Sequence, residues 1–208
     1  ILCGLLSVSL SIYMGGAMLM SGGVGNLAER ARKASLLGGV LALVLFTIGG
    51  FWVSGMDGYQ IVQGPNPGVP QTPLHQVVER TPGALLSNFH EYSVLWIVPA
   101  LTYIGAVLGL VALFARKALL GWWLGAIAWI GVIGTAGAAM FPFMMPSSTN
   151  PSHSLTVWNS GSSELTLMWM LGFTVIFMPL IVMYTSWAFW VMRGKVDPDH
   201  VETSHHAF

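Results

Sequence analysis

The sequence predicts an all-α, polytopic membrane protein with five transmembrane helices, arranged as a four-helix bundle with one additional helix. Hydrophobic residues make up 54% of the 208 residues and charged residues only 8%, whereas soluble domains carry about 25% charged residues. So few charges could not cover a water-exposed surface, which indicates that lipid surrounds much of the chain. The charged residues are also clustered, and the apolar stretches between the clusters are long enough to cross a bilayer.

Each predicted span is a stretch without charged side chains, and together the spans form one transmembrane domain over residues 1–208. A helix needs about 20 residues to cross the hydrocarbon core. The spans are therefore placed at residues 1–20, 34–56, 92–115, 119–141 and 165–192. The fourth charge-free stretch continues past one crossing, but the segment after Phe141 is rich in proline and serine and is assigned to a loop. Pro179 lies inside the fifth span, where a kink is expected.

The basic residues predict the orientation of the spans. An alternating topology places seven of the eight on one side: Arg30, Arg32, Lys33, Arg116, Lys117, Arg193 and Lys195. The other side receives only Arg80. Cytoplasmic loops are enriched in Lys and Arg, so the side with seven basic residues, the tail 193–208 and the C-terminus are expected in the cytoplasm. The outer side then holds two loops, at residues 57–91 and 142–164.

Short inner connections predict that the first and second spans, and the third and fourth, are antiparallel neighbours. Small residues recur on three spans and predict close helix packing: Ser7, Ser11 and Gly15; Gly105 and Gly109; Gly121, Gly125, Gly131, Gly134 and Gly137. A cofactor, quinone or lipid lying along one of these faces is the alternative interpretation. Tryptophans near the span ends are expected to anchor the helices at the interface: Trp52, Trp96, Trp122, Trp123, Trp187 and Trp190.

Titratable side chains avoid the middle of every predicted span. The carboxylates are Glu29, Asp57, Glu79, Glu91, Glu164, Asp197, Asp199 and Glu202. The histidines are His75, His90, His153, His200, His205 and His206. Ionisable groups at mid-membrane depth mark proton relays, ion sites and haem ligands. The chain is therefore expected to hold no haem by histidine ligation, no metal site and no catalytic residue.

The individual acidic and histidine residues have structural interpretations. Asp57, before a glycine, is read as a turn residue. Glu91 and Glu164 are read as acids in the first turns of the third and fifth spans, where they favour the helix dipole, with Ser163 as the N-cap of the fifth. His153 is interpreted as a solvated side chain, and His205 and His206, next to acidic residues in the tail, as at most an adventitious metal site without a function.

Several function classes are excluded by composition. The single cysteine, Cys3, excludes an internal disulfide and a c-type haem attachment motif. Zero net charge gives no footprint for a nucleic-acid partner. The chain begins at Ile1 without a basic leader segment, so it is interpreted as the middle of a longer protein whose upstream part is missing.

One stretch of the sequence is distinctive: Met140-Phe-Pro-Phe-Met-Met-Pro-Ser-Ser-Thr149, followed by Ser154-Leu-Thr-Val-Trp-Asn159 and then Ser162-Ser-Glu-Leu-Thr-Leu167. It closely resembles the last outer loop and final helix of subunit II of the cytochrome bd-type quinol oxidases. The likeness continues, in order, through Asp57-Gly-Tyr59, through Leu95-Trp-Ile-Val-Pro-Ala-Leu101 and through Tyr184-Thr185.

This resemblance implies a function that the residues alone do not give. Oxidases of this type couple quinol oxidation to oxygen reduction in bacterial cytoplasmic membranes, and subunit I carries two haems b and one haem d. The chain would be the second half of a haem-free accessory subunit that scaffolds subunit I. Implied partners are subunit I, the missing N-terminal half, a small single-span subunit and membrane lipids, with quinol as the substrate of the complex. A quinone or a lipid bound on the outside of the bundle is compatible with this role.

Two other functions were weighed. Half of a secondary transporter would have broken helices and polar sites near the midplane, and only Pro179 and the glycine-rich fourth span favour it. A haem-binding anchor for a soluble dehydrogenase would need histidine pairs inside the spans, where the sequence places none.

Overall fold

The computed structural model describes residues 1–23, 25–64 and 76–191. Five helices in it are long and apolar enough to cross a membrane, which confirms the predicted fold class. They are α1 (Leu2–Gly22), α2 (Asn26–Ser54), α4 (Ile97–Phe114), α5 (Ala118–Met140) and α6 (Glu164–Val191). A 3-10 turn, η3 (Ser93–Trp96), leads directly into α4.

The helices begin and end within two residues of the predicted limits except at the starts of α2 and α4; α4 begins at Ile97, after η3, rather than at residue 92. Helix α2 begins at Asn26 rather than at residue 34, so Arg30, Arg32 and Lys33 lie in its first turns and not in a connecting loop. The prediction failed at the start of α2 because it ended spans at charged residues. Charged side chains are compatible with a helix that extends beyond the hydrocarbon, and Arg32 forms an ion pair of 3.0 Å with Glu29 one turn away.

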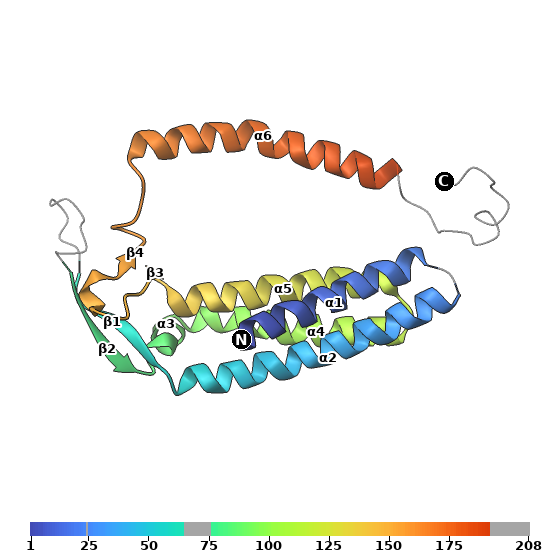
Figure 1. Cartoon of the computed structure of the whole chain (residues 1–208), viewed down its shortest axis with the longest axis horizontal. Helices are drawn as coiled ribbons and strands as arrows, with labels where there is room; N and C mark the ends of the chain where they lie inside the picture. Colours follow the sequence, from blue (N-terminus) through green and yellow to red (C-terminus); the bar gives the residue numbers. More distant parts are fainter. Residues whose placement is uncertain (24, 65–75, 192–208) are drawn as a thin grey trace.

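Four of the helices form an elongated bundle (Figure 1). The antiparallel pairs α1–α2 and α4–α5 confirm the predicted neighbours, and contacts between α1 and α5 and between α2 and α4 close the bundle. Its core holds two clusters of buried apolar side chains: Tyr13, Ala17, Leu110 and Leu113 in one, and Leu6, Leu10 and Ala42 in the other.

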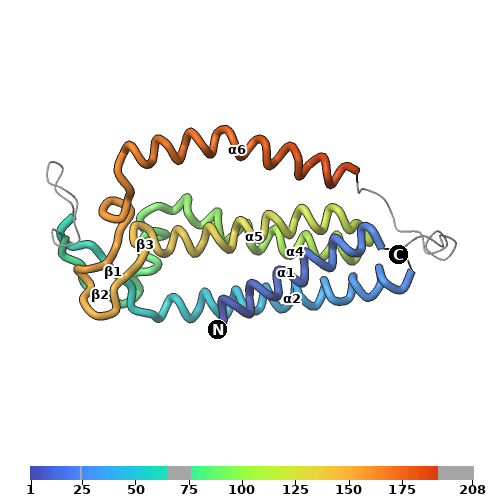
Figure 2. The backbone as a smooth tube through the Cα atoms, turned by 45° about the horizontal axis from the view of Figure 1, so that its top comes forward, coloured from blue at the N-terminus to red at the C-terminus, as the bar shows by residue number. Residues whose placement is uncertain are grey.

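Helix α6 stands apart from this bundle. It runs alongside the other helices at a distance in both views of the backbone (Figures 1 and 2). No residue of α6 is buried, although the helix is as apolar as the others. It is the additional helix that the sequence predicts.

Glycines provide the close contacts inside the bundle. A Cβ atom on Gly105 would lie 2.8 Å from backbone atoms of α5, and one on Gly121 would lie 2.8 Å from the Leu113 side chain. Gly131 and Gly134 likewise face Thr102 and Val98 of α4. The predicted packing role of the glycines on α4 and α5 is therefore confirmed, except at Gly137, which has open space around it.

The predicted small-residue face of α1 was wrong as an internal packing face. Ser7, Ser11 and Gly15 are exposed. The face that packs on α2 instead contains Ser9, Leu10, Tyr13, Gly16 and Ala17. The spacing of four residues occurs on both faces of this helix, and the face with the larger side chains fills the bundle core.

The outer loops contain short strands that the sequence analysis missed. Strand β1 (Asp57–Gln63) pairs with β2 (Val77–Pro82), and β3 (Phe143–Met145) pairs with β4 (Leu155–Thr156), both antiparallel. Short helical segments complete this end: η2 (Ala84–Leu86), α3 (Ser87–Glu91) and η4 (Pro151–His153). These elements form a cap at one end of the bundle (Figure 1).

Candidate functional site

The polar centre of the bundle is Tyr13, whose side chain is 1% exposed. Its hydroxyl donates a hydrogen bond of 2.7 Å to the carbonyl oxygen of Gly121 on α5. The Ser35 hydroxyl on α2 donates to the backbone carbonyl of Tyr13. Gly109 and Gly125 leave the room for the ring, because a Cβ on either would overlap it. Tyr13 thus joins α1 to α2, α4 and α5.

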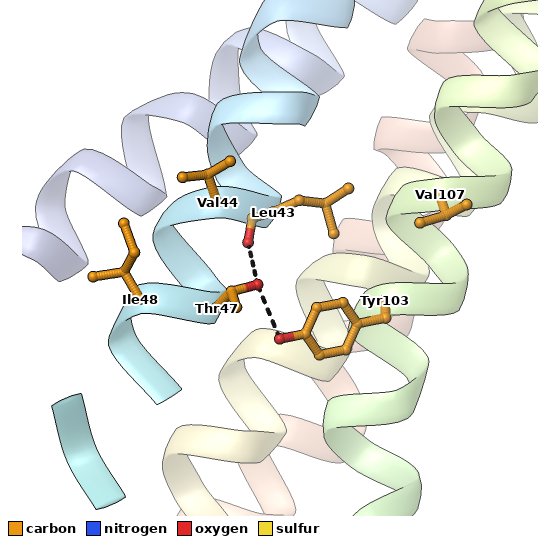
Figure 3. Close-up of a pocket in the computed structure, with 6 residues that line it drawn as sticks. All are labelled: Leu43, Val44, Thr47, Ile48, Tyr103 and Val107. Atoms are coloured by element: carbon orange, nitrogen blue, oxygen red, sulfur yellow. Dashed lines mark hydrogen bonds between the residues drawn. The ribbon is translucent and has the colours of Figure 1, made fainter. Parts of the chain in front are cut away.

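A shallow apolar groove lies on the outside of the bundle between α2 and α4 (Figure 3). It has a volume of about 340 Å³ and is lined by Leu43, Val44, Thr47, Ile48, Tyr103 and Val107. Its polar spot consists of two hydroxyl groups. Thr47 donates to the carbonyl oxygen of Leu43 at 2.8 Å, so the contact of 3.1 Å between the hydroxyls has Tyr103 as the donor. Both protons are therefore used, and the groove offers hydrogen-bond acceptors only.

The titratable residues singled out in the sequence are scattered rather than gathered into one site. Asp57 opens β1, opposite Pro82, instead of occupying a turn. His90 and Glu91 end the short helix α3, so the expected dipole role of Glu91 at the start of the third span was wrong. Tyr92 and the 3-10 turn η3 separate Glu91 from the start of α4. His153 ends η4, with its ring nitrogen 3.5 Å from the Asn150 amide.

The predicted start of the last helix is confirmed. Glu164 is the acid of the first turn of α6. The Ser163 hydroxyl accepts a hydrogen bond of 3.4 Å from the backbone N–H of Thr166, as an N-cap does.

In the described part of the chain, no three His, Cys, Asp or Glu side chains gather into a group that could hold a metal ion. The described histidines, His90 and His153, both lie in the outer cap, beyond the ends of the spanning helices. These residues do not fit a haem set between the membrane helices. His75, His200, His205 and His206, with the basic residues Arg193 and Lys195, lie outside the described residues.

The outer cap is held together by side chains that bridge the two hairpins. Gln76, only 6% exposed, donates to the carbonyl oxygens of Ser154 at 2.6 Å and Ser152 at 3.3 Å. Arg80 donates to the carbonyl oxygen of Ser148 at 2.6 Å and lies over the Tyr59 ring, 5.4 Å from its centre. Arg80 therefore ties the segment that leads to α6 to the first hairpin.

Comparison with known proteins assigns the chain to a family. The family model described as cytochrome bd terminal oxidase subunit II matches residues 1–192. The chain belongs to the cytochrome bd terminal oxidase subunit II family. The resemblance stated from the residues of the outer loop is thereby confirmed.

Members of the cytochrome bd terminal oxidase subunit II family are similar to the chain along its whole length. A probable cytochrome oxidase subunit 2 of Haemophilus influenzae is 36% identical over 207 residues. The cytochrome bd-I ubiquinol oxidase subunits 2 of Escherichia coli K12 and Escherichia coli O157:H7 are each 36% identical over 208 residues. In each case the match covers 100% of this chain and 55% of the relative, so the chain spans about half the length of these proteins.

Proposed function

We propose that this chain is the second half of a haem-free accessory subunit of a cytochrome bd-type quinol oxidase in a bacterial inner membrane. In this role it carries no catalytic residue and scaffolds the haem-bearing subunit I, which oxidises quinol and reduces oxygen. The family match over residues 1–192 is the observation that carries the proposal.

The placement of ligating side chains supports the division of labour between subunits. A haem within the membrane needs an axial ligand such as histidine at the depth of the spanning helices. Of the polar side chains that the bundle buries, Tyr13 and Ser35 form bonds between helices. Ser9 bonds within α1 to the carbonyl oxygen of Leu5, and the hydroxyl of Thr102 has no hydrogen-bond partner among the described residues. The described core is therefore suited to holding helices together.

The apolar groove between α2 and α4 supports a second proposal, which concerns binding of an apolar chain. Leu43, Val44, Ile48 and Val107 give it an apolar wall, and it opens on the outside of the four-helix bundle. An acyl or isoprenoid chain of a membrane lipid or quinone suits such a wall. We assign the groove to such a chain, which would be held by shape and apolar contact.

The alternative of half a secondary transporter receives no support from the geometry. Transporters of that kind place substrate at discontinuous helices near the midplane. Here α1, α2, α5 and α6 are each continuous, with Pro179 accommodated inside α6.

The test of the proposed function is haem retention. In the purified oxidase containing the full-length subunit, haems b and d are expected to stay with subunit I when the subunits are separated under mild conditions. The His90→Ala and His153→Ala variants should keep the haem spectrum and haem content of the parent complex. Haem that is retained by the isolated subunit II, or lost in either variant, would overturn the assignment.

A further inference from the structure

Six large apolar side chains are exposed on the segment that links α5 to α6. They are Met140, Phe141, Met144, Met145, Val157 and Trp158, with exposed fractions between 42% and 66%. We call these six residues the outer apolar patch. They lie beyond the end of α5 or at its last turn, in the cap where the polypeptide leaves the hydrocarbon. Exposed apolar side chains in this number mark a surface that is covered by something other than water.

The outer apolar patch belongs to an ordered structure. The backbone N–H of Val157 donates to the carbonyl oxygen of Pro142 at 3.0 Å. The rings of Phe141 and Trp158 meet edge to face, with their centres 6.1 Å apart. Phe143 pairs with Thr156 across the β3–β4 hairpin, and both are buried. The two ends of the segment, which carry Phe141 and Val157–Trp158, are thus bound to each other.

The polar, serine-rich middle of the same segment contacts the β1–β2 hairpin. Residues 147–154 are rich in serine, and the first hairpin binds their backbone through Tyr59, Gln76 and Arg80. The segment is therefore divided: its middle is tied to the polar β1–β2 hairpin, while its two ends, next to α5 and α6, present the outer apolar patch.

Charge distinguishes this segment from the other outer loop. Residues 118–163 contain no Asp, Glu, Lys or Arg, whereas the loop at residues 57–91 contains Asp57, Glu79, Arg80 and Glu91. Insertion into the interface of a bilayer is costly for charges and favourable for Trp, Phe and Met side chains. The membrane helices at both ends of the segment keep it close to the bilayer surface.

We propose that the outer apolar patch is a lipid-binding surface, inserted at the boundary between headgroups and acyl chains of the outer leaflet. The partner is phospholipid, and the absence of charge on the segment means that zwitterionic and anionic headgroups serve equally. The cap is then a membrane-anchored element whose serine-rich middle stays in water. This inference is independent of which reaction the complex catalyses.

The experiment is a spin-label depth measurement on the full-length protein, with its partner subunits, in phosphatidylcholine vesicles. Nitroxide labels are attached at Met145→Cys and, as a second position in case the first variant fails to fold, at Val157→Cys. Thr149→Cys, exposed in the serine-rich middle, is the matched control. Frequent collisions of the nitroxide with oxygen, which concentrates in lipid, indicate a label in the bilayer. Frequent collisions with a neutral nickel chelate, which stays in water, indicate a label in the aqueous phase.

Labels at residues 145 and 157 are expected to collide more with oxygen than with nickel, and the label at residue 149 more with nickel. Adding phosphatidylglycerol should leave these values unchanged. Two results would overturn the proposal. Nickel access at 145 and 157 equal to that at 149 would place the patch in water. Low access of both reagents there would mean that a protein surface covers it.

Discussion

Tyr13 shows how one side chain can organise a membrane bundle. Its ring occupies space that Gly109 and Gly125 leave free, and its hydroxyl reaches Gly121 on a third helix. The sequence predicts the glycine faces but not that the Tyr13 ring fills the space beside them. The position of a tyrosine within an apolar stretch does not show whether its side chain faces the bundle core or the outside. The available signal was the pair of glycines on two different spans, Gly109 and Gly125, because such glycines leave room for a large side chain from a third helix.

Two neighbouring glycines on α1 give a matched prediction at this scale. A Cβ on Gly16 would lie 2.8 Å from the Ala31 carbonyl oxygen and the Ser35 Cβ on α2, while one on Gly15 meets nothing within 4 Å. Gly16→Ala should therefore push α1 and α2 apart and cost about 1–3 kcal/mol, as overpacking does. Gly15→Ala should change stability little.

The measurement for this pair is the midpoint of thermal unfolding of the full-length protein in detergent. A midpoint lower for Gly16→Ala than for Gly15→Ala supports the packing face of α1 described above. Equal midpoints would restore the face with Ser7, Ser11 and Gly15 that the sequence suggested.

The secondary-structure elements differ in how far the sequence predicts them. Long charge-free stretches located all five spans, because the hydrocarbon thickness fixes both their length and their composition. The strands were missed because they are short and their pairing depends on contacts between loops far apart in the chain, such as Gln76 with Ser154. Assignment of all 208 residues to one domain stays a prediction.

Gln76 supplies the prediction at the scale of elements. Gln76→Ala removes the donor that joins β2 to the β3–β4 segment and leaves the Ser154 carbonyl poorly satisfied, which costs about 1–3 kcal/mol. The effect should appear as faster hydrogen exchange at residues 154–157, because the hairpins then separate more easily. Gln60→Ala, at an exposed position on β1, is the control and should leave exchange unchanged. Unaltered exchange in Gln76→Ala would mean that the cap does not depend on this bridge.

The two ends of the molecule differ in the charge of their connecting segments. The first turns of α2 and the α4–α5 connection carry basic residues, and both lie at the end of the bundle opposite the hairpins (Figure 1). Because cytoplasmic segments are enriched in Lys and Arg, the end with the basic residues is predicted to lie in the cytoplasm and the cap outside.

Cysteine accessibility in intact cells tests this orientation of the full-length protein. Thr149→Cys should react with a membrane-impermeant maleimide added from outside. Ser204→Cys, in the tail, should react only after the inner membrane is permeabilised. Labelling of Ser204→Cys in unopened spheroplasts would reverse the topology.

The isolation of α6 bears on how such a protein is made. Residues 2–140 contain all the helices of the bundle, so these helices can settle against one another while the ribosome is still translating the final segment. No residue of α6 is buried against these helices. Its packing partners therefore lie outside residues 2–140, in lipid, in the rest of the full-length subunit or in other subunits, so α6 acquires them separately from the folding of the four-helix bundle.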